Sequence, residues 1–113
     1  MLDIMERYNN FADTIKNCCS VLLTLNDDRL LYVIFEKLSI DVACYLHPDS
    51  LKIFLDDGYI NLDIFNRTAR LREDFLNLEK KYAYRPSAYF IRNSEEWNDV
   101  FKQADKVYNL LYL

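Results

Sequence analysis

Cys44 and His47 are the residues whose types and spacing best suit chemistry, because three positions on a helix place both side chains on one face. With Cys18 or Cys19 they could offer thiolate and imidazole ligands to zinc. The two-residue spacing of ligand cysteines is absent, however, and the pair has neither the orienting third group nor the oxyanion donor that a cysteine nucleophile needs. With a single glycine, a glycine-rich phosphate loop is also excluded. We therefore expect no catalysis, no metal and no cofactor.

Apolar residues recur at alternating spacings of three and four through most of the chain, which holds only one glycine and two prolines. This spacing predicts amphipathic helices, whereas strands would need a period of two. We expect an all-α protein, a compact antiparallel or orthogonal bundle of four longer helices plus one short helix, in a single domain over residues 1–113. The stripes predict that the following residues are buried: Phe11, Ile15, Leu22, Ile34, Leu38, Phe75, Leu78, Trp97 and Phe101.

Capping signals divide the first half of the chain. A first helix is expected over residues 2–25, and Asn26, followed by two aspartates, predicts the N-cap of a second. The second helix should bend near Ser39. It should stop near His47, because Pro48 disfavours helical geometry in the residue before it and suits the first turn of a short helix.

The second half carries similar signals. Gly58, the only glycine, predicts a left-handed residue just past the short helix, and Asn61 predicts the cap of the next helix. Residues 83–92 predict a loop, with a short extended piece at 88–91. Asn93, with a glutamate three positions later, predicts a capping box that opens the last helix.

Cysteine content and hydropathy predict the compartment. Three cysteines, two of them adjacent, do not suit a disulfide framework and favour reduced thiols packed as small hydrophobes. Asp3 and Glu6 stand where a secretory signal would carry positive charge. The longest apolar run, residues 18–25, is far shorter than the roughly 20 residues of a membrane span. We expect a soluble cytoplasmic protein that does not enter a membrane.

The net charge of −4 hides an uneven layout, since residues 26–63 hold eight acids and only three bases. Two adjacent aspartates, at 56 and 57, fall at a predicted helix C-terminus, where the helix dipole disfavours them. Acids speed the encounter with a cationic partner, and tyrosines supply buried contact. The segment therefore predicts a partner-binding patch made of Tyr45, Asp49, Asp56, Asp57, Tyr59 and Asp63. The alternative is an ordinary solvated face in which the tyrosines are partly buried.

Residues 64–92 carry the opposite charge, with seven bases and three acids. They could bind nucleic acid, although such proteins are usually basic overall and this chain is acidic. The simpler interpretation is that these bases pair with the acidic segment of the same molecule, or across a homodimer surface, and that Arg70 pairs with Glu73 within its helix. Phosphate contact and base stacking would involve Arg67, Arg70, Lys80, Lys81, Tyr84, Arg85, Tyr89 and Arg92.

A small, acidic, all-helical chain with tyrosines and aspartates around a short middle helix resembles the immunity proteins of bacterial antagonism systems. These include the colicin-nuclease immunity proteins and those of contact-dependent growth inhibition. The resemblance, in size, charge and layout, implies a cytoplasmic protein that neutralises a cognate basic toxin, in many cases a nuclease, by stoichiometric occlusion and without catalysis. The alternatives are a helical nucleic-acid-binding regulator that uses residues 67–92, and an unrecognised enzyme or small-molecule binder.

Overall fold

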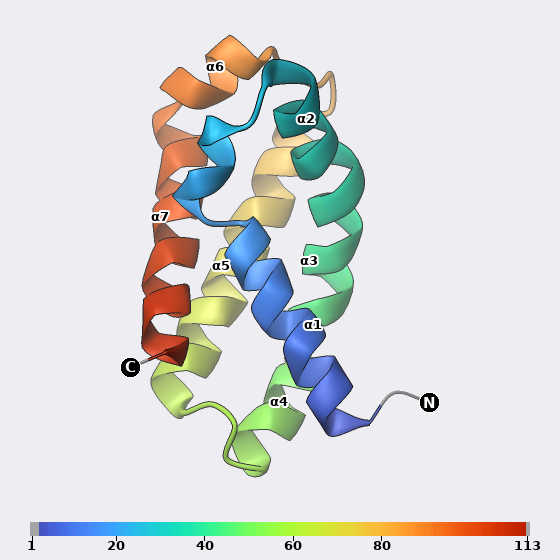
Figure 1. The fold of residues 1–113 in the computed structure, drawn as a ribbon, viewed down its shortest axis with the longest axis vertical. Coiled ribbons are helices and arrows are strands. Elements are labelled where there is room, and N and C mark those ends of the chain that lie inside the picture. The colour runs from blue at the N-terminus through green and yellow to red at the C-terminus, as the bar shows by residue number, and fades with distance from the viewer. Residues whose placement is uncertain (1–2, 113) are drawn as a thin grey trace.

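The computed structural model describes residues 3–112, and every regular element in that range is helical (Figure 1). The fold class predicted from the apolar spacing is therefore confirmed. The elements are α1 (Ile4–Asn17), the 3₁₀ helix η1 (Ser20–Thr24), α2 (Asp27–Tyr32), the π-helical segment η2 (Val33–Leu38), α3 (Ser39–Tyr45), α4 (Pro48–Asp56), α5 (Leu62–Lys81), α6 (Ala88–Asn93) and α7 (Glu95–Leu111).

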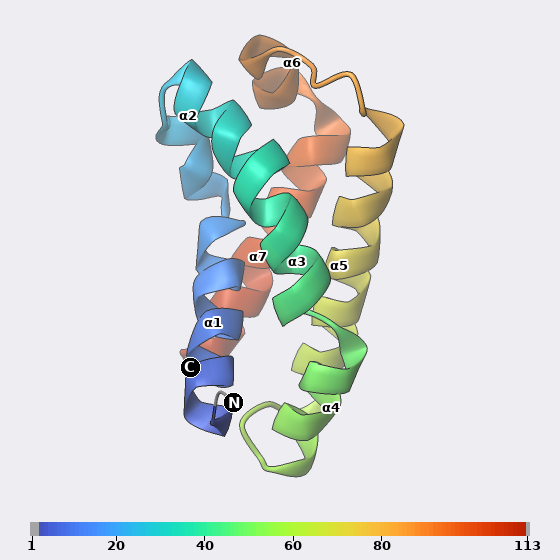
Figure 2. The same cartoon turned by 90° about the vertical axis from the view of Figure 1, so that its right-hand side faces the viewer.

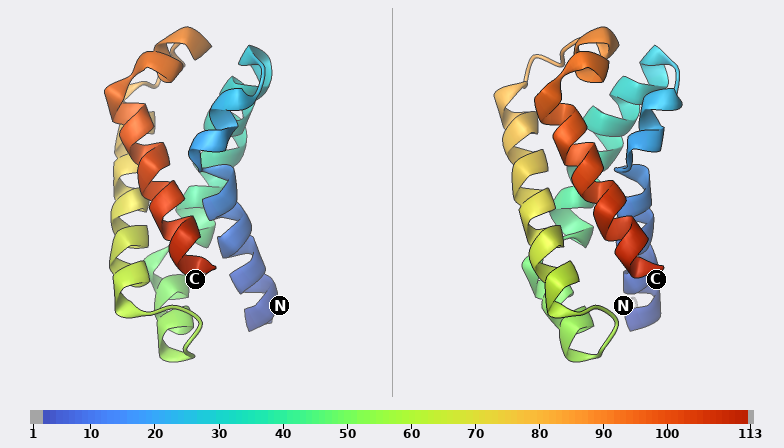
Figure 3. Two further views of the ribbon diagram at one scale, coloured as in Figure 1. Left: turned by 60° about the vertical axis from the view of Figure 1, so that its left-hand side comes forward. Right: turned by 90° about the vertical axis from the view of Figure 1, so that its left-hand side faces the viewer.

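Four long rods run along the long axis of the molecule: α1, the continuous α2–η2–α3, α5 and α7 (Figures 1 and 2). Each rod runs opposite to the one before it in the chain, and α5 packs along α7. In Figure 3 the α5–α7 pair and the α1–α3 pair face each other. The short helices α4 and α6 lie at opposite ends of the bundle, which we call the α4 end and the α6 end.

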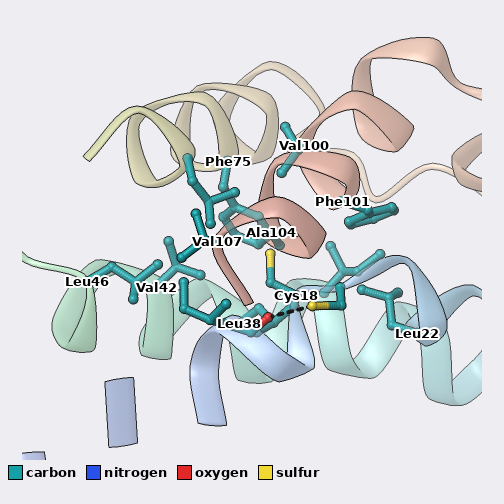
Figure 4. Close-up of a cluster of buried hydrophobic side chains, with 14 of the residues drawn as sticks. Cys18, Leu22, Leu38, Val42, Leu46, Phe75, Val100, Phe101, Ala104 and Val107 are labelled. Carbon is teal, nitrogen blue, oxygen red and sulfur yellow. Dashed lines mark hydrogen bonds between the residues drawn. The ribbon is translucent and has the colours of Figure 1, made fainter. Parts of the chain in front are cut away.

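The core fills the space between the four rods, and all nine residues predicted to be buried are buried. Trp97, in the first turn of α7, is fully buried, with its ring 5.8 Å from that of Phe35 and 5.9 Å from that of Phe75. Figure 4 shows how Cys18 of the α1–η1 junction packs among side chains of α7 and α3. The apolar stripes therefore meet in one continuous cluster.

The first helix is shorter than predicted, because α1 ends at Asn17 and a separate 3₁₀ turn follows. The backbone amide of Ser20 donates to Asp105 Oδ1 at 2.8 Å, and its hydroxyl donates to Oδ2 at 2.6 Å. Asp105, on α7, thus acts as an N-cap for η1 from 85 positions away. No local signal at residues 17–20 marks this break.

The α5–α7 connection also differs from the prediction, because residues 88–93 form the helix α6 and not an extended piece. Ser87 caps it, its hydroxyl accepting from the Phe90 amide at 3.1 Å. The last helix is capped by Ser94, which accepts from the Trp97 amide at 3.3 Å, so the predicted cap at Asn93 was wrong by one residue. The side chain of Asn93 donates instead to the Tyr89 carbonyl.

The remaining capping predictions are confirmed. Asn26 accepts from the Arg29 amide at 2.9 Å, and Asn61 accepts from the Ile64 amide at 2.8 Å. Near Ser39, where a bend was expected, the π-helical segment η2 runs directly into α3, and the Ser39 hydroxyl donates to the Phe35 carbonyl. The helices next to the predicted acidic patch are α4 and α5, and the signals that place them are present in the sequence.

Candidate functional site

The turn between α4 and α5 is a Schellman motif that holds the acidic residues in place. The Tyr59 amide donates to the Phe54 carbonyl at 2.8 Å, and the Gly58 amide donates to the Leu55 carbonyl at 3.2 Å. Gly58 has a φ of 81°, a left-handed geometry that glycine adopts without strain. The Tyr59 ring lies 5.1 Å from that of Tyr8 and 6.4 Å from that of Phe54, so this half-buried ring closes the turn.

Asp56 and Asp57 occupy the last residue and the C-cap of α4. Both are exposed, and within residues 3–112 neither forms an ion pair. The helix dipole places negative partial charge at the same point, so the two carboxylates have no compensating group in the fold. Their negative field is therefore available to a partner outside the molecule.

Asp49 lies in the first turn of α4, with 93% of its side chain exposed. The preceding His47 caps this helix, since its Nδ1 accepts from the Asp49 amide at 3.1 Å. His47 therefore begins α4, whereas the sequence predicted it at the negative end of the preceding helix. The α4 helix is only nine residues long, which is about 12 Å. It thus carries exposed acids at both ends.

The other two predicted patch residues contribute less. Both oxygens of Asp63 accept from Arg67 Nε, at 3.0 and 3.1 Å, so this carboxylate is already paired inside α5. Tyr45 ends α3 and is half-buried. The structure gathers the patch at the α4 end (Figure 2). Within residues 3–112, Asp49, Asp56 and Asp57 have no lysine or arginine partner, although Asp49 Oδ2 lies 3.7 Å from His47 Nδ1.

Two exposed apolar residues at the α4 end were not singled out from the sequence. Ile53 is 37% exposed and Leu62 is 60% exposed. Each lies off the buried stripe of its helix, which is the sequence signal that could have found them. Together with the aspartates they give a surface with apolar contact and a charged rim, as protein interfaces have.

The basic stretch is occupied by ion pairs within the molecule. Arg85 pairs with Glu36, Arg92 with Asp27, Lys81 with Glu96 at 2.9 Å, Arg67 with Asp63 at 3.0 Å and Arg70 with Asp74 at 3.7 Å. Arg70 thus pairs with Asp74 and not with Glu73 as predicted. Three of these acids belong to the acidic segment 26–63, in agreement with the intramolecular pairing expected from the charge layout.

Exposed tyrosines accompany these pairs at the α6 end. Tyr84 is 96% exposed and Tyr89 is 77% exposed. Their rings are accessible for stacking, but the nearby cations of Arg85 and Arg92 are already bound by carboxylates. A phosphate backbone would have to displace those carboxylates, which disfavours nucleic acid on this surface.

The cysteines do not share one surface. Cys44 is exposed, whereas Cys18 and Cys19 are buried. Burial raises the pKa of Cys18 far above its ordinary value, and burial together with the nearby Asp105 raises that of Cys19 to about 12. Both buried thiols therefore stay protonated and unreactive at neutral pH. Residues 3–112 contain no group of three or more histidine, cysteine or acidic side chains arranged to hold a metal.

Comparisons with protein-family models, curated proteins and solved structures give no match to this chain. None of the helices within residues 3–112 combines the length and the apolar character that crossing a bilayer requires. Function must therefore be inferred from the side chains and their arrangement.

Proposed function

We propose that this chain is a binding protein whose α4 end docks on a basic partner protein. The observation that carries the proposal is the contrast in charge pairing. Asp49, Asp56 and Asp57 are exposed and form no ion pair with lysine or arginine within residues 3–112, whereas most of the basic stretch is neutralised internally. Unpaired acids steer a cationic partner, and Ile53 and Leu62 supply apolar contact beside them.

We further propose that the partner is a toxin domain, a nuclease by preference, and that the chain is its cytoplasmic immunity protein. A nuclease presents a cationic surface to the phosphates of its substrate, and a cluster of unpaired carboxylates suits that surface. The small size, net charge of −4 and helical fold support the same proposal by resemblance. Inhibition would come from one-to-one occlusion of the substrate surface.

The test is co-expression with the basic proteins encoded beside this gene. One of them should be toxic alone and should form a one-to-one complex with this chain. In the chain that carries Asp56→Lys and Asp57→Lys, association with that toxin should slow by at least about tenfold and become less sensitive to salt. Absence of any toxic neighbour that this chain neutralises would contradict the immunity role.

A matched control reverses two other exposed acids, Glu73→Lys and Glu95→Lys. Neither residue forms an ion pair within residues 3–112, and Glu95 starts α7 near the α6 end. The net charge changes equally, so association should slow far less if the α4 end is the binding surface. If reversal at Arg67 and Arg70 abolishes protection while the Asp56 and Asp57 variant still protects, the basic helix is the binding surface.

A further inference from the structure

A second surface feature lies away from the α4 end, where the end of α1, the 3₁₀ helix η1 and the α2–η2 rod enclose an open groove of about 370 Å³. Its lining includes the aliphatic side chains of Val21, Leu25 and Val33. Val21 is 64% exposed, although it is a large apolar residue. The groove lies where α1 ends at Asn17 and the separate helix η1 follows.

The groove is cationic in an acidic protein. Lys16, Arg29 and Lys37 line it, and none of its lining residues is Asp or Glu. The four other cavities described each include at least one carboxylate. Within residues 3–112, Lys16 and Arg29 form no ion pair, and Lys37 Nζ lies 3.6 Å from Asp41 Oδ2. Two of the three positive charges are therefore unneutralised.

The spacing of these cations restricts what could bind. Arg29 and Lys37 lie eight residues apart on one continuous rod, about 12 Å along its axis. An occupant that lies along the rod and pairs with both would carry negative charges at a similar separation. The residues that line the groove include no aromatic ring for base stacking, which disfavours single-stranded nucleic acid.

We propose that the groove binds an amphipathic acidic helix of a second partner protein. Its apolar side chains would lie on Val21, Leu25 and Val33, while carboxylates on its flanks would pair with Lys16 and Arg29. The groove adjoins η1 and α2, toward the α6 end (Figure 1), so both surfaces could be occupied together. This proposal does not depend on the function proposed for the α4 end.

Three labelled helical peptides of about 20 residues test the proposal by fluorescence anisotropy with the full chain. The first presents leucines at helical spacing with glutamates on both flanks. The second replaces the glutamates with lysines, and the third replaces the leucines with glutamines. The first peptide should bind, the second should not, and the third should bind at least about tenfold more weakly. Anionic phosphatidylglycerol vesicles serve as a fourth probe.

The variant Lys16→Glu with Arg29→Glu should weaken binding of the first peptide by at least about tenfold. The matched control is Lys80→Glu with Lys102→Glu, which changes the net charge equally at two exposed lysines outside the groove. The exposed Val21→Ser gives a second variant if the charge reversal destabilises the fold. Equal effects of the two double variants, no binding of the acidic peptide, or binding of the vesicles without the peptide would each overturn the proposal.

Discussion

The two ends of the bundle differ in what their charged side chains do. At the α6 end, carboxylates hold cations in pairs that connect separate segments, such as Arg92 of α6 with Asp27 of α2, and along α5 Arg67 and Arg70 pair with carboxylates of the same helix. At the α4 end, Asp49, Asp56 and Asp57 have no lysine or arginine partner within residues 3–112. Charge at one end is used to connect helices, and charge at the other end remains available.

The difference shows why charge along a sequence does not identify a binding surface by itself. The basic segment 64–92 has a net charge of similar size to that of the acidic segment 26–63. An arginine within an ion pair projects little field into solvent, because its carboxylate cancels it within less than a Debye length. Charges without a partner, such as those of Asp56 and Asp57, therefore keep a longer reach, and the following changes test the difference between the two ends.

Arg92→Ala should have the largest effect on stability. The Arg92 guanidinium pairs with Asp27 and donates to the carbonyls of Leu25, at 2.7 Å, and Leu23, at 3.4 Å. Loss of these contacts leaves partly buried carbonyls without a donor, so we expect a destabilisation of about 2–3 kcal/mol in urea unfolding. Lys52→Ala, an exposed cation of the α4 end, should change stability by less than about 0.5 kcal/mol. Equal losses of stability in the two variants would contradict the proposed difference between the α6 end and the α4 end.

Tyr59→Ala should be the next largest change, because this ring closes the α4–α5 turn against Tyr8 and Phe54. We expect a loss of about 2 kcal/mol in thermal or urea unfolding, below the cost of truncating a fully buried aromatic residue. Tyr59→Phe keeps the ring contacts and should be nearly neutral. A stable alanine variant that nonetheless loses the basic partner would show that the ring acts at the interface instead.

Asp56→Asn with Asp57→Asn should stabilise the protein by about 0.5–1 kcal/mol, since two negative charges leave the negative end of α4. Asp28→Asn removes an exposed acid from the first turn of α2 and should act in the opposite direction by about 0.5 kcal/mol. Differential scanning calorimetry measures both. If the α4 double variant is less stable than the parent, these two acids stabilise the fold, and the proposed difference between the two ends of the bundle is wrong.

The smallest effects should appear in the pH dependence of stability at two glutamates. Hydrogen bonds from Lys81 and Tyr82 lower the pKa of Glu96, so its stabilising contribution is present at neutral pH and is lost as pH falls below 4.5. Burial raises the pKa of Glu79, so its penalty is present at neutral pH and is relieved on acidification.

Because the two pKa shifts have opposite signs, neutralising the two glutamates should change the melting temperature in opposite directions. At pH 7, Glu96→Gln should melt lower than the parent, and Glu79→Gln should melt higher. Both differences should disappear well below pH 4.5, where the parent carboxyls are protonated. Melting curves at a series of pH values give the comparison, and a pH-independent difference would mean that packing and not charge is responsible.

The fold was predictable mainly where the controlling interaction is local, although the local caps Ser87 and Ser94 were missed. Asn26, Asn61 and Gly58 act on amides or torsions within a few residues, and each was identified from its own neighbourhood. Ser87 offered a similar cap for α6, but the aromatic and β-branched residues after it favoured an extended piece. The break after Asn17 was not predictable, because its cap comes from Asp105 on the last helix.

Of the two candidate surfaces, the acidic patch at the α4 end was predictable from the sequence and the cationic groove was not. The positions of Asp49, Asp56 and Asp57 relative to α4 follow from Pro48 and Gly58, which fix where the helix begins and ends. The pairing of Asp63 with Arg67 follows a four-residue spacing that the sequence displays. The cationic groove has no such signal, because its residues come from α1, η1 and the α2–η2 rod and meet only in the folded chain.

The hydrogen bonds from Ser20 to Asp105 also set an order of events during synthesis. While the N-terminal part of the chain leaves the ribosome, α7 has not yet been made, so the Ser20 amide can donate to water or to the carbonyls of the preceding turn but not to Asp105. We expect the nascent chain to continue its first helix through the two cysteines, as its local sequence favours. Docking of α7 would then interrupt that helix and form η1. The cationic groove would therefore be completed only when the last helix is in place.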